Sequence, residues 1–448
     1  MRRKQVTVVG AGLAGCEAAW QLAERGMAVK LMEMKPQKKT PAHHADDFAE
    51  LVCSNSLRAD RIQNAAGLLK EEMRHLGSLI MRAADANRVP AGGALAVDRA
   101  GFAAMITRMI RNHPHIECMG QECTDIPNGP CIVATGPLTE GVFAEKIQEL
   151  MGEALFFFDA AAPIVSHDSL NMEKVFAASR YDKGDGDDYL NCPLNRDEYF
   201  AFVRELLAAE TVELHEFENK RVFEGCMPVE VMAARGEMTL AFGPMKPVGL
   251  IDPRTGKQPF AVVQLRREDT EGTLYNLVGF QTHLKFPEQK RVFSMIPGLE
   301  AAEFTRYGVM HRNSFLQSPG KLNVHYQCIE HPDVFFAGQI TGVEGYVESA
   351  SSGLVAGINM AEYIQQVDMT TFPVSTAHGA LANHAAHYAG KDFQPMNIAF
   401  GIIESWPEKI RNKQERYTRI AERALAQIDV IRERFATIAP CDNQDEPV

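Results

Sequence analysis

The stretch VTVVGAGLAG, residues 6–15, decides the fold of this chain. Its first four residues form a short apolar run typical of a buried strand, and its glycines follow with the spacing G-x-G-x-x-G. Glycines so spaced let backbone N–H groups and a helix N-terminus approach a pyrophosphate without a Cβ in the way. The candidate cofactor-binding residues of this turn are Gly10, Ala11, Gly12, Leu13, Ala14 and Gly15.

A second strand supports a bound dinucleotide. The apolar pattern predicts this strand over Ala28–Met32, and Glu33 ends it. An acidic residue about 20 positions after such a glycine turn binds a ribose hydroxyl. Because no arginine directly follows Glu33, the sequence favours FAD or NAD over NADP. An ordinary strand–helix turn without a ligand is the alternative, and the combined context disfavours it.

Length and composition bound the class of protein. The 448 residues exceed one typical core and indicate two to three domains. A hydrophobic share of 46% and a charged share of 23% are those of an ordinary globular protein. No apolar run reaches the ~18 residues of a membrane span, and glycines interrupt the first one early. Nine cysteines without a secretion signal favour a reduced, cytoplasmic protein with no membrane partner.

The charge of the chain argues against a nucleic-acid partner. The formal net charge is −12, whereas RNA-binding domains are usually basic. Basic residues gather at 35–61 and at 285–312, and we interpret most of them as solvated surface. Three histidines (His378, His384 and His387) lack a cysteine or carboxylate to complete a metal site. We therefore expect no metal and a solvated helix face there.

The pattern of apolar, polar and glycine residues changes at two places along the chain. Residues 131–137 form an apolar strand that ends in Thr-Gly, which places Gly136 near the cofactor. Residues 183–188 are polar and glycine-rich and predict a domain boundary, after which strand-like runs follow. Apolar strand character returns at 334–339, so Gly338, Gln339 and, in the next loop, Gly342 are further cofactor-binding candidates.

These changes predict an α/β fold in which a discontinuous Rossmann-like FAD-binding domain carries an inserted α+β domain. We expect the first part of the FAD-binding domain at 1–185, the insert at 186–321 and the second part at 322–448. Helical spacing of apolar residues predicts four of the helices. They are expected at 66–86, 98–112, 349–360 and 407–435.

Several segments resemble one known family. The matching segments are Val8–Gly15, Pro41–His44, Glu50–Arg58, Phe223–Glu230, Arg306–Asn313, Phe336–Ser352 and Phe393–Asn397. Together they make the chain similar, nearly end to end, to the folate- and FAD-dependent tRNA (uracil-5-)-methyltransferases. The cysteine-bearing segments are far more specific than the glycine turn.

The resemblance implies a substrate, cofactors and two catalytic cysteines. The family methylates carbon 5 of a uridine in the tRNA T-loop, at position 54, to give ribothymidine. Methylenetetrahydrofolate is the one-carbon donor, FAD is carrier and reductant, and NADH or NADPH reduces the flavin. By match to the family, Cys226 is the nucleophile that adds to uracil carbon 6, and Cys53 is its partner. A thiolate suits such an addition, and a second group must take the proton from carbon 5.

Other functions stay open at this point. The same chemistry could act on ribosomal RNA. The acidic balance would suit an FAD oxidoreductase that acts on a small molecule. A flavin-bound scaffold for RNA modification, without chemistry of its own, is a third reading. The sequence sets neither the nicotinamide preference, the RNA-docking face, nor the oligomeric state.

Overall fold

A five-stranded parallel sheet organises the glycine turn. The computed structural model describes residues 5–40, 42–152, 154–182, 187–212, 227–390 and 393–437. Five parallel strands form this sheet in the order β16-β7-β1-β2-β6, as the predicted Rossmann-like fold requires. Their bounds are β1 Gln5–Val9, β2 Ala28–Glu33, β6 Ile116–Gly120, β7 Cys131–Val133 and β16 Val334–Phe336. Strand β16 comes from the far end of the chain, so the domain is discontinuous.

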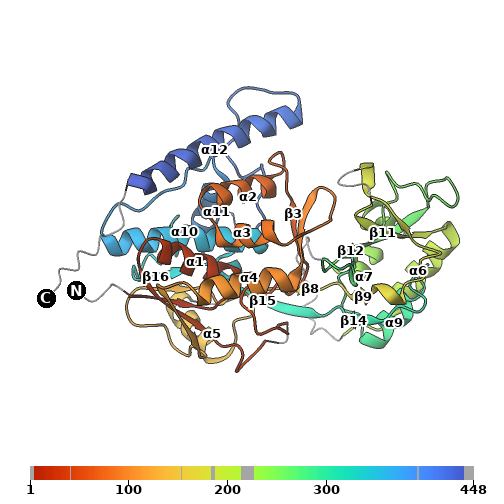
Figure 1. The fold of residues 1–448 in the computed structure, drawn as a ribbon, viewed down its shortest axis with the longest axis horizontal. Coiled ribbons are helices and arrows are strands. Elements are labelled where there is room, and N and C mark those ends of the chain that lie inside the picture. The colour runs from red at the N-terminus through yellow and green to blue at the C-terminus, as the bar shows by residue number, and fades with distance from the viewer. Residues whose placement is uncertain are drawn as a thin grey trace.

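Helices from both ends of the chain pack together around this sheet (Figure 1). Helix α1, Leu13–Glu24, lies against α10, Tyr346–Gln365. A Cβ added at Gly353 would lie 2.2 Å from the carbonyl oxygen of Ala14, so glycine permits this close approach. The other helices of this domain are α2 Ala65–His75, α3 Leu79–Ala86, α4 Arg99–Arg111, α5 Gly141–Met151, α11 Ala377–His387 and α12 Lys413–Thr437. A small sheet beside them has the order β3-β5-β4, with β3 Ser56–Ala59, β4 Arg88–Val89 and β5 Ala94–Val97.

A second sheet forms the core of the other lobe, on the right in Figure 1. Its order is β10-β11-β12-β13-β9-β14, and every pair in it is antiparallel. The strands are β9 Ile164–Ser166, β10 Phe176–Ala177, β11 Tyr189–Leu194, β12 Ala261–Arg267, β13 Leu274–Leu277 and β14 Phe304–Arg306. Helices α6 Arg196–Ala208, α7 Val229–Ala234, α8 Thr239–Phe242 and α9 Phe286–Phe293 belong to the same lobe. We call this lobe the second domain.

Two antiparallel strands, β8 Ala154–Ala160 and β15 Met310–Leu316, run between the two lobes. The second sheet takes β9 and β10 from before residue 185 and its other strands from after it. The expected boundary at 185/186 therefore falls inside this sheet. Residues 183–186, which suggested that boundary, lie outside the described residues. Among the helices described, none has the length and apolar character to cross a membrane.

The helix expected at 66–86 is two helices. Helix α2 ends at His75 and α3 begins at Leu79, and Gly77 between them has a φ of +73°. That conformation breaks a right-handed helix and suits glycine. The helices at 98–112 and 349–360 are confirmed with small changes of boundary, and the last helix begins at Lys413 rather than at 407.

The expected solvated face is wrong for two of the three histidines. His378 and His384 are buried rather than solvated, because α11 packs between α2 and α10. Cys118 and Cys123 are half-buried on or next to the edge strand β6. By contrast, Cys16 and Cys131 are fully buried.

Candidate functional site

A cleft opens at the carboxyl ends of the parallel strands, with about 1290 Å³ of empty space that extends into open solvent. Ligands of open α/β sheets bind at this edge. Its walls come from the glycine turn, the ends of β2 and β7, the segment after β2, and the start of α10. Nine of the predicted cofactor residues line it: Gly10, Ala11, Gly12, Leu13, Ala14, Glu33, Gly136, Gly338 and Gln339.

Glycine occupies the three positions in the turn for different structural reasons. Gly10 has a φ of +97°, and a Cβ there would lie 2.6 Å from the carbonyl oxygen of Ala134. Gly15 does not line the cleft, and a Cβ on it would lie 1.8 Å from the carbonyl oxygen of Gly10. Gly12 differs, because nothing lies within 4 Å of the place where its Cβ would be. Gly10 and Gly15 therefore shape the turn, whereas Gly12 leaves the cleft open.

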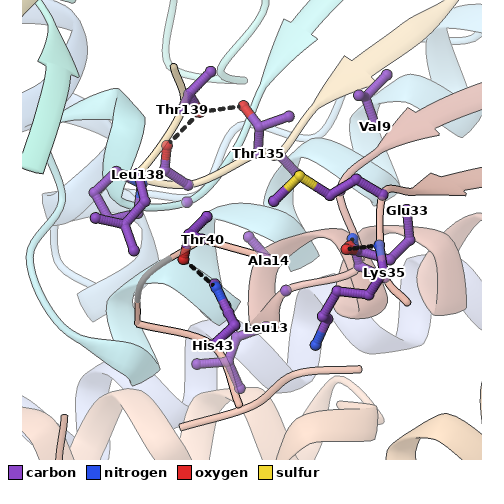
Figure 2. A pocket seen from close by; sticks show the side chains of 18 of the residues that line it. Val9, Leu13, Ala14, Glu33, Lys35, Thr40, His43, Thr135, Leu138 and Thr139 are labelled. Carbon is purple, nitrogen blue, oxygen red and sulfur yellow. Dashed lines mark hydrogen bonds between the residues drawn. The ribbon is translucent and has the colours of Figure 1, made fainter. Parts of the chain in front are cut away.

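The Glu33 carboxylate is tied to the turn (Figure 2). One of its oxygens accepts a 2.7 Å hydrogen bond from the Ala11 N–H, and the other accepts a 3.0 Å bond from the Lys35 N–H. The side chain is 9% exposed, so these bonds form away from bulk water. Glu33 therefore fixes the path of the glycine turn relative to β2. A ribose contact at the same carboxylate stays a prediction.

The opposite wall is built by the segment that follows β7. The Thr139 hydroxyl lies 2.7 Å from Thr135 Oγ1 and 2.8 Å from the carbonyl oxygen of Gly136 (Figure 2). These bonds fold the segment back over the cleft. Sequence reasoning singled out Gly136 here but missed both threonines, although hydroxyls at the end of a parallel strand are a usable signal.

The loop after β16 only partly matches expectation. Gln339 lines the cleft, and its amide donates a hydrogen bond to Glu344. Gly342 does not line the cleft: it has a φ of +85°, and a Cβ there would lie 2.3 Å from the ring of Phe393. Gly342 is therefore glycine because of a tight turn against an aromatic ring.

A half-buried histidine lies in the cleft wall. His43 Nδ1 is 2.6 Å from Thr40 Oγ1, and both side chains point into the space drawn in Figure 2. Burial, and then the positive charge of Lys35, lowers the pKa of His43 below its usual value. At neutral pH the ring is therefore uncharged and can donate or accept a hydrogen bond.

Cys53 lies beside the mouth of the cleft. Its neighbour Val52 lines the cleft, and the Cys53 N–H donates a 2.7 Å hydrogen bond to the hydroxyl oxygen of Tyr346, which also lines it. The Ser54 N–H reaches the same oxygen at 3.2 Å. Tyr346 begins α10, so residues almost 300 positions apart meet here. Cys226, the other predicted catalytic residue, lies outside the described residues.

Three arginines close the other side of the Cys53 loop, residues 51–55. Arg99 comes from α4, Arg266 from β12 and Arg306 from β14. Each donates at least one hydrogen bond to this loop. The sequence assigned none of the three to the site, and Arg306 fell in the basic group interpreted mostly as solvated surface, because arginines scattered over 200 positions carry no local signal. Within the described ranges, no cluster of histidine, cysteine, aspartate and glutamate could hold a metal ion.

Comparison with known proteins assigns the family. The family model described as "Glucose inhibited division protein A" matches residues 5–368. The chain belongs to this family. One member, named methylenetetrahydrofolate--tRNA-(uracil-5-)-methyltransferase TrmFO, from Anoxybacillus flavithermus, is 60% identical over 425 residues, which cover 95% of this chain and 98% of the relative. A relative of the same name from Listeria monocytogenes is 58% identical over 433 residues, which cover 96% and 100%.

Solved structures of the glucose inhibited division protein A family agree with the fold. GidA of Aquifex aeolicus superimposes with a TM-score of 0.71 at 15% sequence identity, over 98% of this chain and 76% of that one. Identity this low supports the fold alone. The resemblance read from the motifs is confirmed by the close TrmFO relatives, and the predicted fold class by these structures.

Proposed function

We propose that this protein methylates carbon 5 of a uridine in tRNA, with methylenetetrahydrofolate as the one-carbon donor. The observation that carries the proposal is the likeness to relatives of that name, at 58 to 60% identity over nearly the whole chain. At the finer level, we propose the T-loop uridine at position 54 as the target, which gives ribothymidine. NADH or NADPH is the proposed source of electrons. We expect the reaction to take place in the cytoplasm.

The cleft fits FAD. Its floor is a glycine turn at the start of α1, and the open space beside Gly12 leaves room for a pyrophosphate. Residues 10–14 would hold that pyrophosphate, Glu33 the ribose, and Gly136, Gly338 and Gln339 the remainder of the cofactor. When bound, FAD supplies the reducing equivalents that turn a methylene group into a methyl group.

The two cysteines carry the proposed covalent and proton-transfer steps. Cys226 Sγ adds to carbon 6 of the uracil ring, which makes carbon 5 nucleophilic. Cys53 Sγ accepts the proton from carbon 5 after the new carbon–carbon bond has formed. The position of Cys53 beside Val52 and Tyr346, at the cleft mouth, supports this second role. His43, uncharged in the cleft wall, can hydrogen-bond the folate or the base.

The test is a methylation assay on defined RNA. Purified protein is incubated with methylenetetrahydrofolate, NADH or NADPH, and an unmodified tRNA transcript, and the RNA is digested and searched for 5-methyluridine. We expect 5-methyluridine in this transcript and none in a matched transcript with cytidine at position 54. A ribosomal RNA transcript forms the second arm.

The outcomes separate the proposals. Product in the ribosomal RNA arm alone would overturn the tRNA target while keeping the chemistry. Flavin reduction by a nicotinamide without product in either RNA would overturn RNA methylation and leave an oxidoreductase. Comparison of NADH with NADPH at equal concentration measures the cofactor preference directly.

A further inference from the structure

Side chains of both domains hold the main chain of the Cys53 loop. The carbonyl oxygen of Leu51 accepts a hydrogen bond from Arg99, and that of Val52 accepts one from Arg306. Arg99 belongs to α4 of the first domain and Arg306 to β14 of the second. The two residues that precede Cys53 are thus held by side chains of different domains.

Arg266 of β12 adds two directed bonds to the same loop. Its Nε donates to Asn55 Oδ1 at 2.9 Å, and its Nη2 donates to Ser54 Oγ at 2.7 Å. Asn55 in turn donates to the carbonyl oxygens of Val97, at 2.9 Å, and Arg267, at 2.8 Å. The planar guanidinium suits this two-point contact, which a lysine could not reproduce. The loop is therefore a joint between the domains.

The joint carries more positive than negative charge. Glu268, whose side chain is 3% exposed, pairs with Arg99 at 2.7 Å and is the carboxylate that also acts on Arg266 and Arg306. Burial lowers the pKa of Arg306, and the like charge of Arg99 lowers it further. Arg306 Nε is buried without a hydrogen-bond partner among the described residues. Buried cations in excess require an anion nearby.

The Cys53 side chain is placed to supply that anion. The three arginines donate hydrogen bonds to Leu51, Val52, Ser54 and Asn55, so Cys53 lies between the residues that they hold. A thiolate at Cys53 would interact favourably with all three guanidinium groups, and the phenol of Tyr346 is a further titratable group beside it. We propose that Arg99, Arg266 and Arg306 stabilise Cys53 as a thiolate. The second domain contributes two of these arginines and so enables this cysteine to act as a proton acceptor. The role as a proton acceptor rests on the proposed function. The thiolate itself can be tested without it.

The proton balance of the step is simple. Thiolate Sγ of Cys53 takes the proton from uracil carbon 5: the carbon–hydrogen bond breaks, a sulfur–hydrogen bond forms, and the electron pair stays on the pyrimidine. A neutral thiol could not accept this proton. Arg266 and Arg306 are positioning residues in this scheme, since they act through Cys53.

The experiment measures the alkylation of Cys53 by iodoacetamide as a function of pH, in the full-length protein with the flavin it retains. Peptide mapping assigns the modification to Cys53 among the nine cysteines. In the unaltered protein we expect a midpoint below the ~8.5 of a free cysteine. In R266Q and R306Q we expect a higher midpoint and, for each unit of rise, about tenfold slower alkylation near neutral pH.

Two further variants sharpen the measurement. R291Q replaces an exposed arginine of α9 in the same domain, which pairs with Glu288 at 2.7 Å, and should keep the original midpoint. R266K keeps the charge but not the two-point contact. It should keep a midpoint near the original, while amide hydrogen exchange of the loop speeds up and kcat falls with an unchanged KM for the folate.

The alkylation results test the proposed thiolate whether or not the protein methylates tRNA. An ordinary midpoint near 8.5 in the unaltered protein would overturn it, even if R266Q and R306Q failed to fold. An unchanged midpoint in the two folded variants would overturn it as well. Failure of the tRNA assay with a low midpoint would overturn the proposed function and leave the thiolate in place.

Discussion

The cofactor cleft and the Cys53 loop lie side by side but are built in opposite ways. The cleft is assembled mainly at the ends of the strands of one parallel sheet, and its glycine turn is held by backbone-to-carboxylate bonds, such as the bond from Ala11 to Glu33. The Cys53 loop has no regular structure of its own. It is held by Tyr346 and by arginines from two domains.

This difference predicts that cofactor binding and the methylation reaction depend on different parts of the molecule. The residues that line the cleft belong to the first domain, so cofactor binding should depend little on the second domain. A loop held from both domains has its geometry only when the domains are correctly packed. Changes in the cleft should therefore remove the flavin, whereas changes around the loop should spare the flavin and remove the reaction.

The largest expected effect is at Gly12. Gly12→Val should fold, because the φ of −74° suits any residue and nothing lies within 4 Å of the added Cβ. The valine side chain would occupy the space proposed for the pyrophosphate. We expect protein purified without flavin absorbance. Gly401→Val is the matched control, since Gly401 is exposed with equal space and lies away from the cleft. Undiminished flavin in Gly12→Val would refute the cofactor assignment.

The next effect tests the two cysteines. Cys226→Ala and Cys53→Ala should each keep bound flavin and lose methyl transfer, the second by about 10²–10⁴-fold as typical for a lost proton acceptor. Product formation on the tRNA transcript and flavin absorbance of the same samples are the two measurements. Cys118→Ala, on the edge strand β6, should behave as the unaltered protein. Full activity of either catalytic variant would remove that cysteine from the scheme.

A smaller effect is expected at the end of β2. Glu33→Gln keeps the size of the side chain but removes the charge that strengthens the bond from the Ala11 N–H. Glu33 is also the proposed partner of a ribose hydroxyl, and the loss of one charge-assisted hydrogen bond to FAD, worth about 1.5–3 kcal/mol, lowers FAD affinity about 10- to 150-fold. Titration of apoprotein with FAD measures this directly. Glu117→Gln, an exposed change on β6, is the control, and an equal affinity in both would contradict the role of Glu33.

The smallest effect concerns strand β3, which directly follows the Cys53 loop. The Lys70 ammonium is buried and donates 2.7 Å bonds to the carbonyl oxygens of Leu57 and Ala59. Burial lowers the pKa of Lys70 to about 7. Above that pH the unfolded chain holds a proton that the folded chain has released, so this lysine makes the protein more stable as pH rises from about 7 toward 10.

Lys70→Met should remove that dependence. The difference in unfolding free energy between the two proteins should change by up to about 1.4 kcal/mol per pH unit between pH 7.5 and 9.5. Urea unfolding at several pH values measures it. Lys146→Met, at the surface of α5, should leave the slope unchanged. A Lys70→Met slope equal to that of the unaltered protein would show that Lys70 stays charged in the fold.

Sequence patterns predicted the cleft well and the exposure of single side chains poorly. The turn at 10–15 and the strand ends at Glu33 and Gly136 are local signals, because each follows its own strand directly. His378 was expected on a solvated face, yet it is buried with its Nδ1 2.7 Å from Ser351 Oγ. Packing of α11 against other helices decided this, and no local pattern contains it.

By itself, the sequence determined the parallel sheet, the glycine turn with its acidic partner and the identity of the two cysteine segments, since the residues that dictate each feature are neighbours in the chain. Only the tertiary structure decided what surrounds Cys53. Tyr346, Arg99, Arg266 and Arg306 reach that loop from four elements of two domains. Charge and hydrogen bonding act through space, so an environment made of distant segments exists only after the chain has folded.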